Sequence, residues 1–207
     1  METIDRASWP RRATFALFAA YADPFFDLAV RVRAPGLLEA ATERGQSLFG
    51  VVLHAVMASA NEVPELRTRV RGERVVRHAV VHPSWVVLGD DATMRFANGR
   101  FSDHLPTFLA SVAEVSTVAR RKPPVSDAHT WDDFVYVSCM PRLDLQGVRV
   151  ERSGRPDDTV PHVVWGRIVD GSFGLTVSAH HGLVDGLHVE QLVVGLEERL
   201  AAYASDG

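Results

Sequence analysis

Two adjacent histidines, His180 and His181, stand near the C-terminal end of the chain in the string HHGLVDGLH. They follow an apolar run typical of a strand, and neighbouring side chains on a strand point to opposite faces of a sheet. We therefore expect one imidazole to enter a site while the other packs. Because an imidazole changes its protonation near neutral pH, it is suited to act as a general base that takes a proton from a hydroxyl group.

Such a base needs a partner that fixes its tautomer and a donor that stabilises the oxyanion formed in the reaction. Residue types and spacing alone leave both partners unassigned, and they leave structural roles open. A histidine pair is more often structural or exposed than catalytic, and Asp185 occupies the N-cap position of a predicted helix. On this ground alone, the chain is an enzyme-like domain with a candidate histidine base.

The elements that must position these residues follow from the spacing of apolar side chains, which is helical in some segments and alternating in others. The predicted helices cover residues 11–22 (with Ser8 as a cap), 37–45, 48–61 (with Ser47 as a cap), 102–121 and 186–203. The predicted strands cover residues 27–32, two hairpins at 68–81 and 83–99, and runs at 134–140, 145–151, 162–170 and 173–181, with a loop at 121–133. Because helices and strands do not alternate regularly, we expect one α+β domain over residues 1–207 rather than a doubly wound fold.

Composition excludes several classes of function. The chain has 207 residues, of which 46% are hydrophobic and 23% charged, as in ordinary folded domains. The net charge of −4 offers no attraction to nucleic acid or to an anionic membrane. No apolar run approaches the roughly 20 residues that span a bilayer, and the N-terminus does not read as a signal peptide, so we expect a soluble, cytoplasmic protein. A single cysteine, Cys139, excludes an internal disulfide and a cysteine-rich zinc site.

The string HHGLVDGLHVEQL resembles the HHxxxDG signature of the chloramphenicol acetyltransferase family, which the acyltransferase domains of 2-oxo acid dehydrogenase complexes share. Other segments resemble this family in the same order along nearly the whole chain. They are SWPRRATFALF, ANEVPELRTRVRGERVV, VHPSWVV, VSCMPRLDL and VVWGRIVDGSFGLTVSAHH. The resemblance implies a two-layer sandwich of a mixed β-sheet with helices packed on it. It also implies a homotrimer with active sites at the subunit interfaces.

The resemblance assigns roles to four residues of these segments. His181, the second histidine of the signature, would take the proton of the acceptor hydroxyl as that hydroxyl attacks the thioester of acetyl-CoA. A local backbone carbonyl would hold its tautomer. Ser138, in VSCMP, would donate a hydrogen bond to the oxyanion. Asp185 would pair with Arg11 and brace the site, an assignment that depends on register because Arg12 is adjacent.

The acceptor pocket is where the chain departs from the family. Phe18 stands where a tyrosine often occurs, Tyr136 where an asparagine can occur, and Val164 in place of a threonine, while Phe26 keeps an aromatic residue. These four residues would bind the acceptor. Arg167 takes the place of a lysine near the coenzyme and would contact it.

The resemblance therefore implies an O-acetyltransferase that uses acetyl-CoA as a co-substrate, with chloramphenicol as the acceptor and antibiotic inactivation as the result. No bound cofactor and no metal are expected. Two alternatives stay open. The same mechanism would serve a different small hydroxylated acceptor, which the altered pocket favours, or the chain would be a non-catalytic homologue that binds a ligand or a partner.

Overall fold

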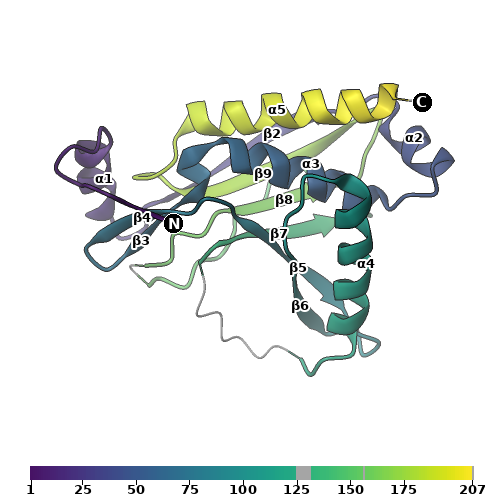
Figure 1. Ribbon diagram of the computed structural model, residues 1–207, viewed down its shortest axis with the longest axis horizontal. Coiled ribbons are helices and arrows are strands. Elements are labelled where there is room, and N and C mark those ends of the chain that lie inside the picture. The colour runs from purple at the N-terminus through teal and green to yellow at the C-terminus, as the bar shows by residue number, and fades with distance from the viewer. Residues whose placement is uncertain (125–131, 156, 207) are drawn as a thin grey trace.

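A mixed six-stranded sheet forms the centre of the protein in this computed structural model, which describes residues 1–124, 132–155 and 157–206 (Figure 1). Its strands lie in the order β2 (Phe25–Arg33), β9 (Ser172–His180), β8 (His162–Gly166), β7 (Phe134–Met140), β5 (His82–Leu88) and β6 (Met94–Asn98). A smaller sheet has the order β1 (Glu2–Ile4), β4 (Arg74–Arg77) and β3 (Thr68–Arg71). In the large sheet β5, β7 and β8 are parallel neighbours and the other pairs are antiparallel. This arrangement confirms the predicted α+β class.

The three longest helices pack on one face of the large sheet (Figure 1). The helices of the described residues are α1 (Arg12–Ala19), α2 (Leu37–Glu43), α3 (Leu48–Glu62), α4 (Leu105–Arg120) and α5 (Gly186–Ser205), with a short 3-10 turn at Pro64–Arg67. Helix α3 begins where Ser47 accepts a hydrogen bond from the Gly50 amide, as its sequence predicts. Because α3 is apolar nearly all round, it packs both on the sheet and against α5.

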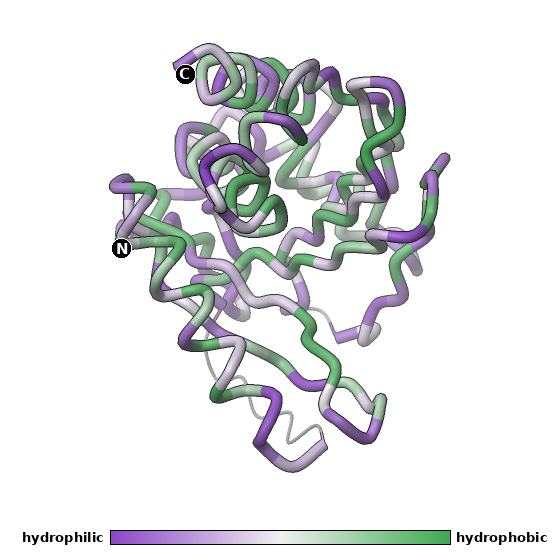
Figure 2. The backbone as a smooth tube through the Cα atoms, turned by 90° about the vertical axis from the view of Figure 1, so that its right-hand side faces the viewer, coloured by the Kyte–Doolittle hydropathy of each residue, from purple (hydrophilic) through white to green (hydrophobic). Residues whose placement is uncertain are grey.

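Each strand of the large sheet presents two different faces, and hydrophobic and hydrophilic residues alternate along the chain (Figure 2). The face towards the helices is apolar and contributes Trp85, Val137, Trp165, Leu175 and Val177 to the core. The opposite face, here called the polar face, carries Ser84, Tyr136, Ser138, His162, Thr176 and Ser178. Two kinds of surface are thus available on the two sides of the same strands.

The structure corrects two sequence predictions. Residues 145–151, all of which are described, form no strand although they alternate in character. They run across the polar face, where a Cβ at Gly174 would overlap the carbonyl oxygen of Leu145 and the amide of Val148 donates to Thr176. The alternating sequence pattern reflects the burial of Leu145 against the sheet, and these residues pair with no strand. Ser8 caps no helix, since its hydroxyl donates to Asp5 and α1 starts later than predicted. The predicted loop at 121–133 lies mostly outside the described residues.

Candidate active site

The two adjacent histidines lie on opposite faces at the end of β9, as the strand pattern predicts. His180 is buried and packs against Phe15 and Phe25, with ring centroids 5.7 and 5.4 Å away. His181 is stacked on Phe18 at 4.0 Å and lies 4.6 Å from Phe26. The chain turns directly after them at Gly182, where a Cβ would lie 2.9 Å from the ring of His180. His181 is the more accessible of the two and is held between aromatic rings at the turn.

The tautomer of His181 is set by the backbone. Its Nδ1 lies 3.2 Å from the carbonyl oxygen of Val184. A carbonyl oxygen only accepts hydrogen bonds, so Nδ1 carries the proton in this contact and the lone pair is on Nε2. Phe18 and Phe26 hold the ring from the sides, which makes them positioning contacts of the imidazole in this chain. An imidazole arranged in this way can take a proton through Nε2.

An ion pair between Arg11 and Asp185 braces the turn that carries His181. Arg11 donates to Asp185 at 2.8 Å, and it reaches the carbonyl oxygens of His181 and Gly182 at 3.4 Å each. Burial raises the pKa of Asp185, but the hydrogen bond from Arg11 and the positive charges nearby outweigh burial and hold this pKa below its usual value. Arg12 is exposed, so the pairing falls on Arg11. The same carboxylate accepts from the Leu187 amide and caps α5.

Replacing Asp185 by alanine is therefore expected to lower both stability and activity. Loss of the helix cap costs about 1 kcal/mol. Loss of the ion pair adds no more than about 1 kcal/mol, because the Asp185 side chain is 35% exposed. The melting temperature should fall by several degrees, and the released turn should misplace His181. Arg12→Ala is the matched control and should change neither quantity. An Asp185→Ala protein with unchanged melting temperature would contradict the bracing role.

Ser138 lies on the polar face of β7, far from His181 of the same chain. It pairs across the sheet with Val164, and Val164 pairs with Thr176. His181 follows Thr176 by five residues, which corresponds to about 17 Å along the strand. The predicted base and the predicted oxyanion donor therefore do not meet within one copy. They can share a site only if a second copy supplies one of them.

A cavity of about 320 Å³ lies beside Ser138 on the polar face. We call it the Ser138 cavity. Its other lining residues include Ser84, Tyr136, Glu151, Asp158 and His162. Of the residues predicted to bind the acceptor, only Tyr136 lines it, and Val164 is 5% exposed within the sheet. Sequence reasoning missed Ser84, Asp158 and His162. Strand alternation places Ser84 and His162 on this face, but only the strand order brings them together.

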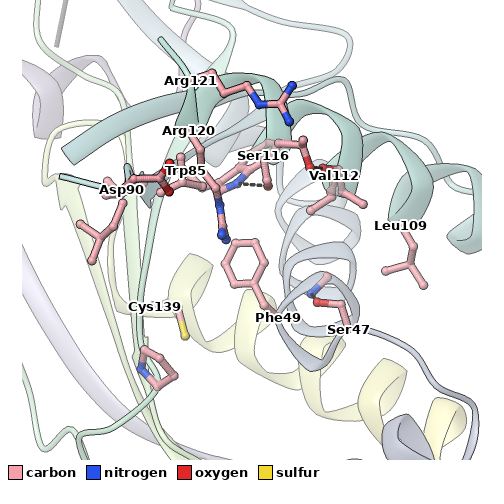
Figure 3. A pocket seen from close by; sticks show the side chains of 17 residues that line it. Ser47, Phe49, Trp85, Asp90, Leu109, Val112, Ser116, Arg120, Arg121 and Cys139 are labelled. Carbon is pink, nitrogen blue, oxygen red and sulfur yellow. Dashed lines mark hydrogen bonds between the residues drawn. The ribbon is translucent and has the colours of Figure 1, made fainter. Parts of the chain in front are cut away.

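A second and larger cavity of about 870 Å³ opens on the helix side of the same strands, between α4 and the start of α3 (Figure 3). Its floor is aromatic, with Phe49 and with Trp85, whose indole donates to Ser116 at 3.1 Å. Arg120 points into it towards Phe49 (Figure 3). Cys139, the residue after Ser138, also lines it, so the two cavities approach one another across β7. Arg167 is exposed beyond the end of β8.

Two buried histidines should make stability depend on pH. Burial lowers the pKa of His180 to about 4 and that of His162 to about 3, from an ordinary value of 6.5. The unfolded chain takes up these protons below about pH 6.5, while the folded chain resists them. The free energy of unfolding should fall as pH drops from 6.5 towards 4, by roughly 1.4 kcal/mol per pH unit and histidine. Melting temperatures from pH 7.5 to 4.5 measure this slope. His162→Leu should flatten it, and an unchanged slope would contradict the assignment.

No helix in the described ranges is both long and apolar enough to traverse a lipid bilayer. In the same part of the chain, no three acidic, histidine or cysteine side chains gather into a group that would hold a metal ion.

The mixed sheet with helices on one face, and the HHxxxDG turn at the end of β9, define a CoA-dependent acyltransferase fold. A solved chloramphenicol acetyltransferase superposes with a TM-score of 0.83 at 22% identity, covering 95% of this chain and 98% of the other. A probable dihydrolipoamide acetyltransferase from Listeria monocytogenes superposes with a TM-score of 0.67 at 17% identity, covering 96% of this chain and 94% of the other.

Comparison of the amino-acid sequence identifies the family as well as the fold. Residues 1–197 match the chloramphenicol acetyltransferase family, and the chain belongs to this family. Chloramphenicol acetyltransferase 2 of Escherichia coli is 20% identical over 200 residues, which cover 94% of each chain. Chloramphenicol acetyltransferase of Clostridioides difficile is 22% identical over 206 residues, which cover 95% of this chain and 94% of the relative.

Proposed function

We propose that this protein transfers the acetyl group of acetyl-CoA to a hydroxyl group of a small molecule, with chloramphenicol as the first acceptor to test. In this role it would inactivate the antibiotic in the cytoplasm. The observation that carries the proposal is the geometry of His181, whose Nδ1 bonds the Val184 carbonyl while aromatic rings hold the imidazole in place. This arrangement leaves Nε2 as the base, which a binding protein without catalysis does not need.

The transfer takes two steps. His181 removes the proton of the acceptor hydroxyl as its oxygen attacks the thioester carbonyl, and a carbon–oxygen bond forms. Ser138 donates a hydrogen bond to the negative oxygen of the tetrahedral intermediate. The carbon–sulfur bond then breaks, and the imidazolium returns its proton to the leaving thiolate of CoA. Atoms and charge balance without any metal or further cofactor.

The distance between His181 and Ser138 within one copy supports an active site shared by two copies. We propose a homotrimer in which His181 of one subunit faces the Ser138 cavity of its neighbour. Heterologous contacts of this kind close into a ring and give every subunit one site. Leu17 on α1 and Tyr21 just after it are 55% and 53% exposed, and both are available for such a contact.

The larger cavity on the helix side is suited to the coenzyme. Its volume of about 870 Å³ has room for a pantetheine chain, and its aromatic floor offers apolar contact. The cations of Arg120 and Arg121 at its rim complement phosphate groups. Arg167, beyond the end of β8, is the further cation proposed to contact the coenzyme. Tyr136 keeps its proposed place beside the acceptor, and Phe18 and Phe26 act through their contacts with His181. Val164 is buried within the sheet and would act only by packing beneath this site.

The test is the release of free CoA from acetyl-CoA, measured with and without chloramphenicol. We expect release that depends on an added alcohol and on His181. Release with chloramphenicol would identify it as an acceptor. If chloramphenicol gives none, a panel of other alcohols decides. The absence of His181-dependent transfer to every alcohol would refute the proposed function and favour a binding protein.

A further inference from the structure

A row of hydrogen-bonding side chains crosses the floor of the Ser138 cavity. Ser84 on β5 pairs with Tyr136 on β7, Tyr136 pairs with His162 on β8, and all three line the cavity. Side chains that face one another across strands in this way lie about 5 Å apart. The row therefore presents polar groups at regular intervals over about 10 Å. Ser138 follows Tyr136 by two residues and is on the same face.

The hydroxyl group of Ser84 on this floor is available to a ligand. Ser84 is 1% exposed, and its Oγ has no hydrogen-bond partner among the described residues. Buried hydroxyl groups are normally hydrogen-bonded, so an unpaired one that lines a cavity calls for a ligand group or a bound water. A hydroxyl can both donate to and accept from such a group.

His162 adds a further donor and acceptor, since no described residue forms a hydrogen bond with its ring. Burial lowers the pKa of its imidazole to about 3, so the ring is neutral at physiological pH and offers one donor and one acceptor. Its ring contacts that of Tyr136 edge to face, with centroids 4.7 Å apart.

The wall of the cavity is also polar. It comes from the segment that runs across the sheet after β7, which contributes Glu151, Ser153, Arg155 and Asp158. One carboxylate oxygen of Asp158 accepts from the amide and the hydroxyl of Ser153, at 3.1 and 2.7 Å. Its other oxygen lies 3.9 Å from Arg152 and keeps room for a further donor. Glu151 and Arg155 are exposed and complete a rim with charges of both signs.

The geometry points to a polyhydroxylated acceptor in the Ser138 cavity: one hydroxyl group is acetylated beside Ser138, and further hydroxyl groups bond to Ser84, His162 and Asp158. This inference rests on the proposed O-acetyl transfer and names its substrate class. Hydroxyl groups fit because they donate to the Asp158 carboxylate and the imidazole acceptor, while they also accept from Ser84. A cavity of about 320 Å³ holds a sugar or a cyclitol.

An acceptor with a large apolar ring fits this floor less well. It would cover Ser84 and His162 without giving them partners, and a site with buried polar groups rejects such analogues strongly. The inference therefore ranks polyols above chloramphenicol, whose aromatic ring carries no hydroxyl group to bond with this floor.

The experiment compares acceptors that are similar in size and differ in the number of hydroxyl groups. CoA release is followed with cyclohexanol, a cyclohexanetriol, myo-inositol and methyl glycosides, with chloramphenicol alongside. We expect kcat/KM for the best polyol to exceed that for cyclohexanol by at least tenfold. Ser84→Ala and His162→Leu should each lower the ratio of these two values by about tenfold or more. The control is Ser59→Ala, which should leave the ratio unchanged. Ser59 is a buried serine on α3 whose hydroxyl donates to the Ala55 carbonyl at 2.9 Å.

Thermal melting separates a binding role of Ser84 from a structural one. Ser84→Ala removes an unpaired hydroxyl, so its melting temperature should stay the same or rise, whereas Ser59→Ala should lower it. The polyol inference would be overturned if His181-dependent transfer to cyclohexanol or chloramphenicol equalled or exceeded transfer to the polyols and the cavity variants left it unaffected. The proposed O-acetyl transfer would then still stand. A lack of His181-dependent transfer to any alcohol would overturn both.

Discussion

His181→Ala is expected to remove acetyl transfer almost completely, with kcat reduced by up to about 10⁴-fold. The alanine cannot take the hydroxyl proton, and nothing else on the polar face or the histidine turn offers an imidazole at the same point, since His180 is turned away towards Phe15 and Phe25. The measurement is CoA release at saturating acetyl-CoA with the best acceptor of the panel.

The fold should survive this change. The side chain of His181 is only half-buried, and the Arg11–Asp185 pair that braces its turn bonds to the backbone carbonyl of residue 181 rather than to its ring. Melting temperature and assembly should therefore match the unaltered protein within a few degrees. Turnover above about a tenth of the original rate, far beyond what loss of a general base allows, would remove His181 from the role of base.

The local parts of this fold were predictable because their causes are local. Helix α5 follows from apolar spacing and from an aspartate at its start, and Asp185 does cap it. The opposite orientations of His180 and His181 follow from strand geometry alone. The pairing of Arg11 with Asp185 spans almost the whole chain, and no local pattern implies it. It was reached only through the resemblance of both segments to one family.

The parts that sequence reasoning missed depend on which strands are neighbours. Residues 145–151 alternate like a strand, but they lie across Gly166 and Gly174, whose lack of side chains lets a second layer of backbone approach. Ser84 and His162 are far apart in sequence and become neighbours of Tyr136 through the order β5-β7-β8. Alternation predicts that each faces one side of a sheet, but it contains no information about the register between distant strands.

Ser138→Ala is the second change with a large expected effect, a loss of about 10²–10³ in kcat with little change in KM for acetyl-CoA. The hydroxyl acts on the oxyanion, which exists only after attack on the thioester, so ground-state binding should be nearly unaffected. The fold has no need of this hydroxyl, because Ser138 is a partly exposed residue at the edge of a cavity. A rise in KM with unchanged kcat would assign Ser138 to substrate binding instead.

The separation of His181 and Ser138 within one copy makes a stronger test possible. Subunits of His181→Ala and Ser138→Ala are each nearly inactive, yet a mixed assembly contains sites that combine intact His181 from one copy with intact Ser138 from the next. With random mixing of equal amounts in a closed ring, about a quarter of all sites are complete, so about a quarter of the original activity should return. Refolding the two variants together makes the mixture, and combining them after separate assembly is the control. If both residues served the same site from one chain, no mixture would recover activity, and the interface site would have to be abandoned.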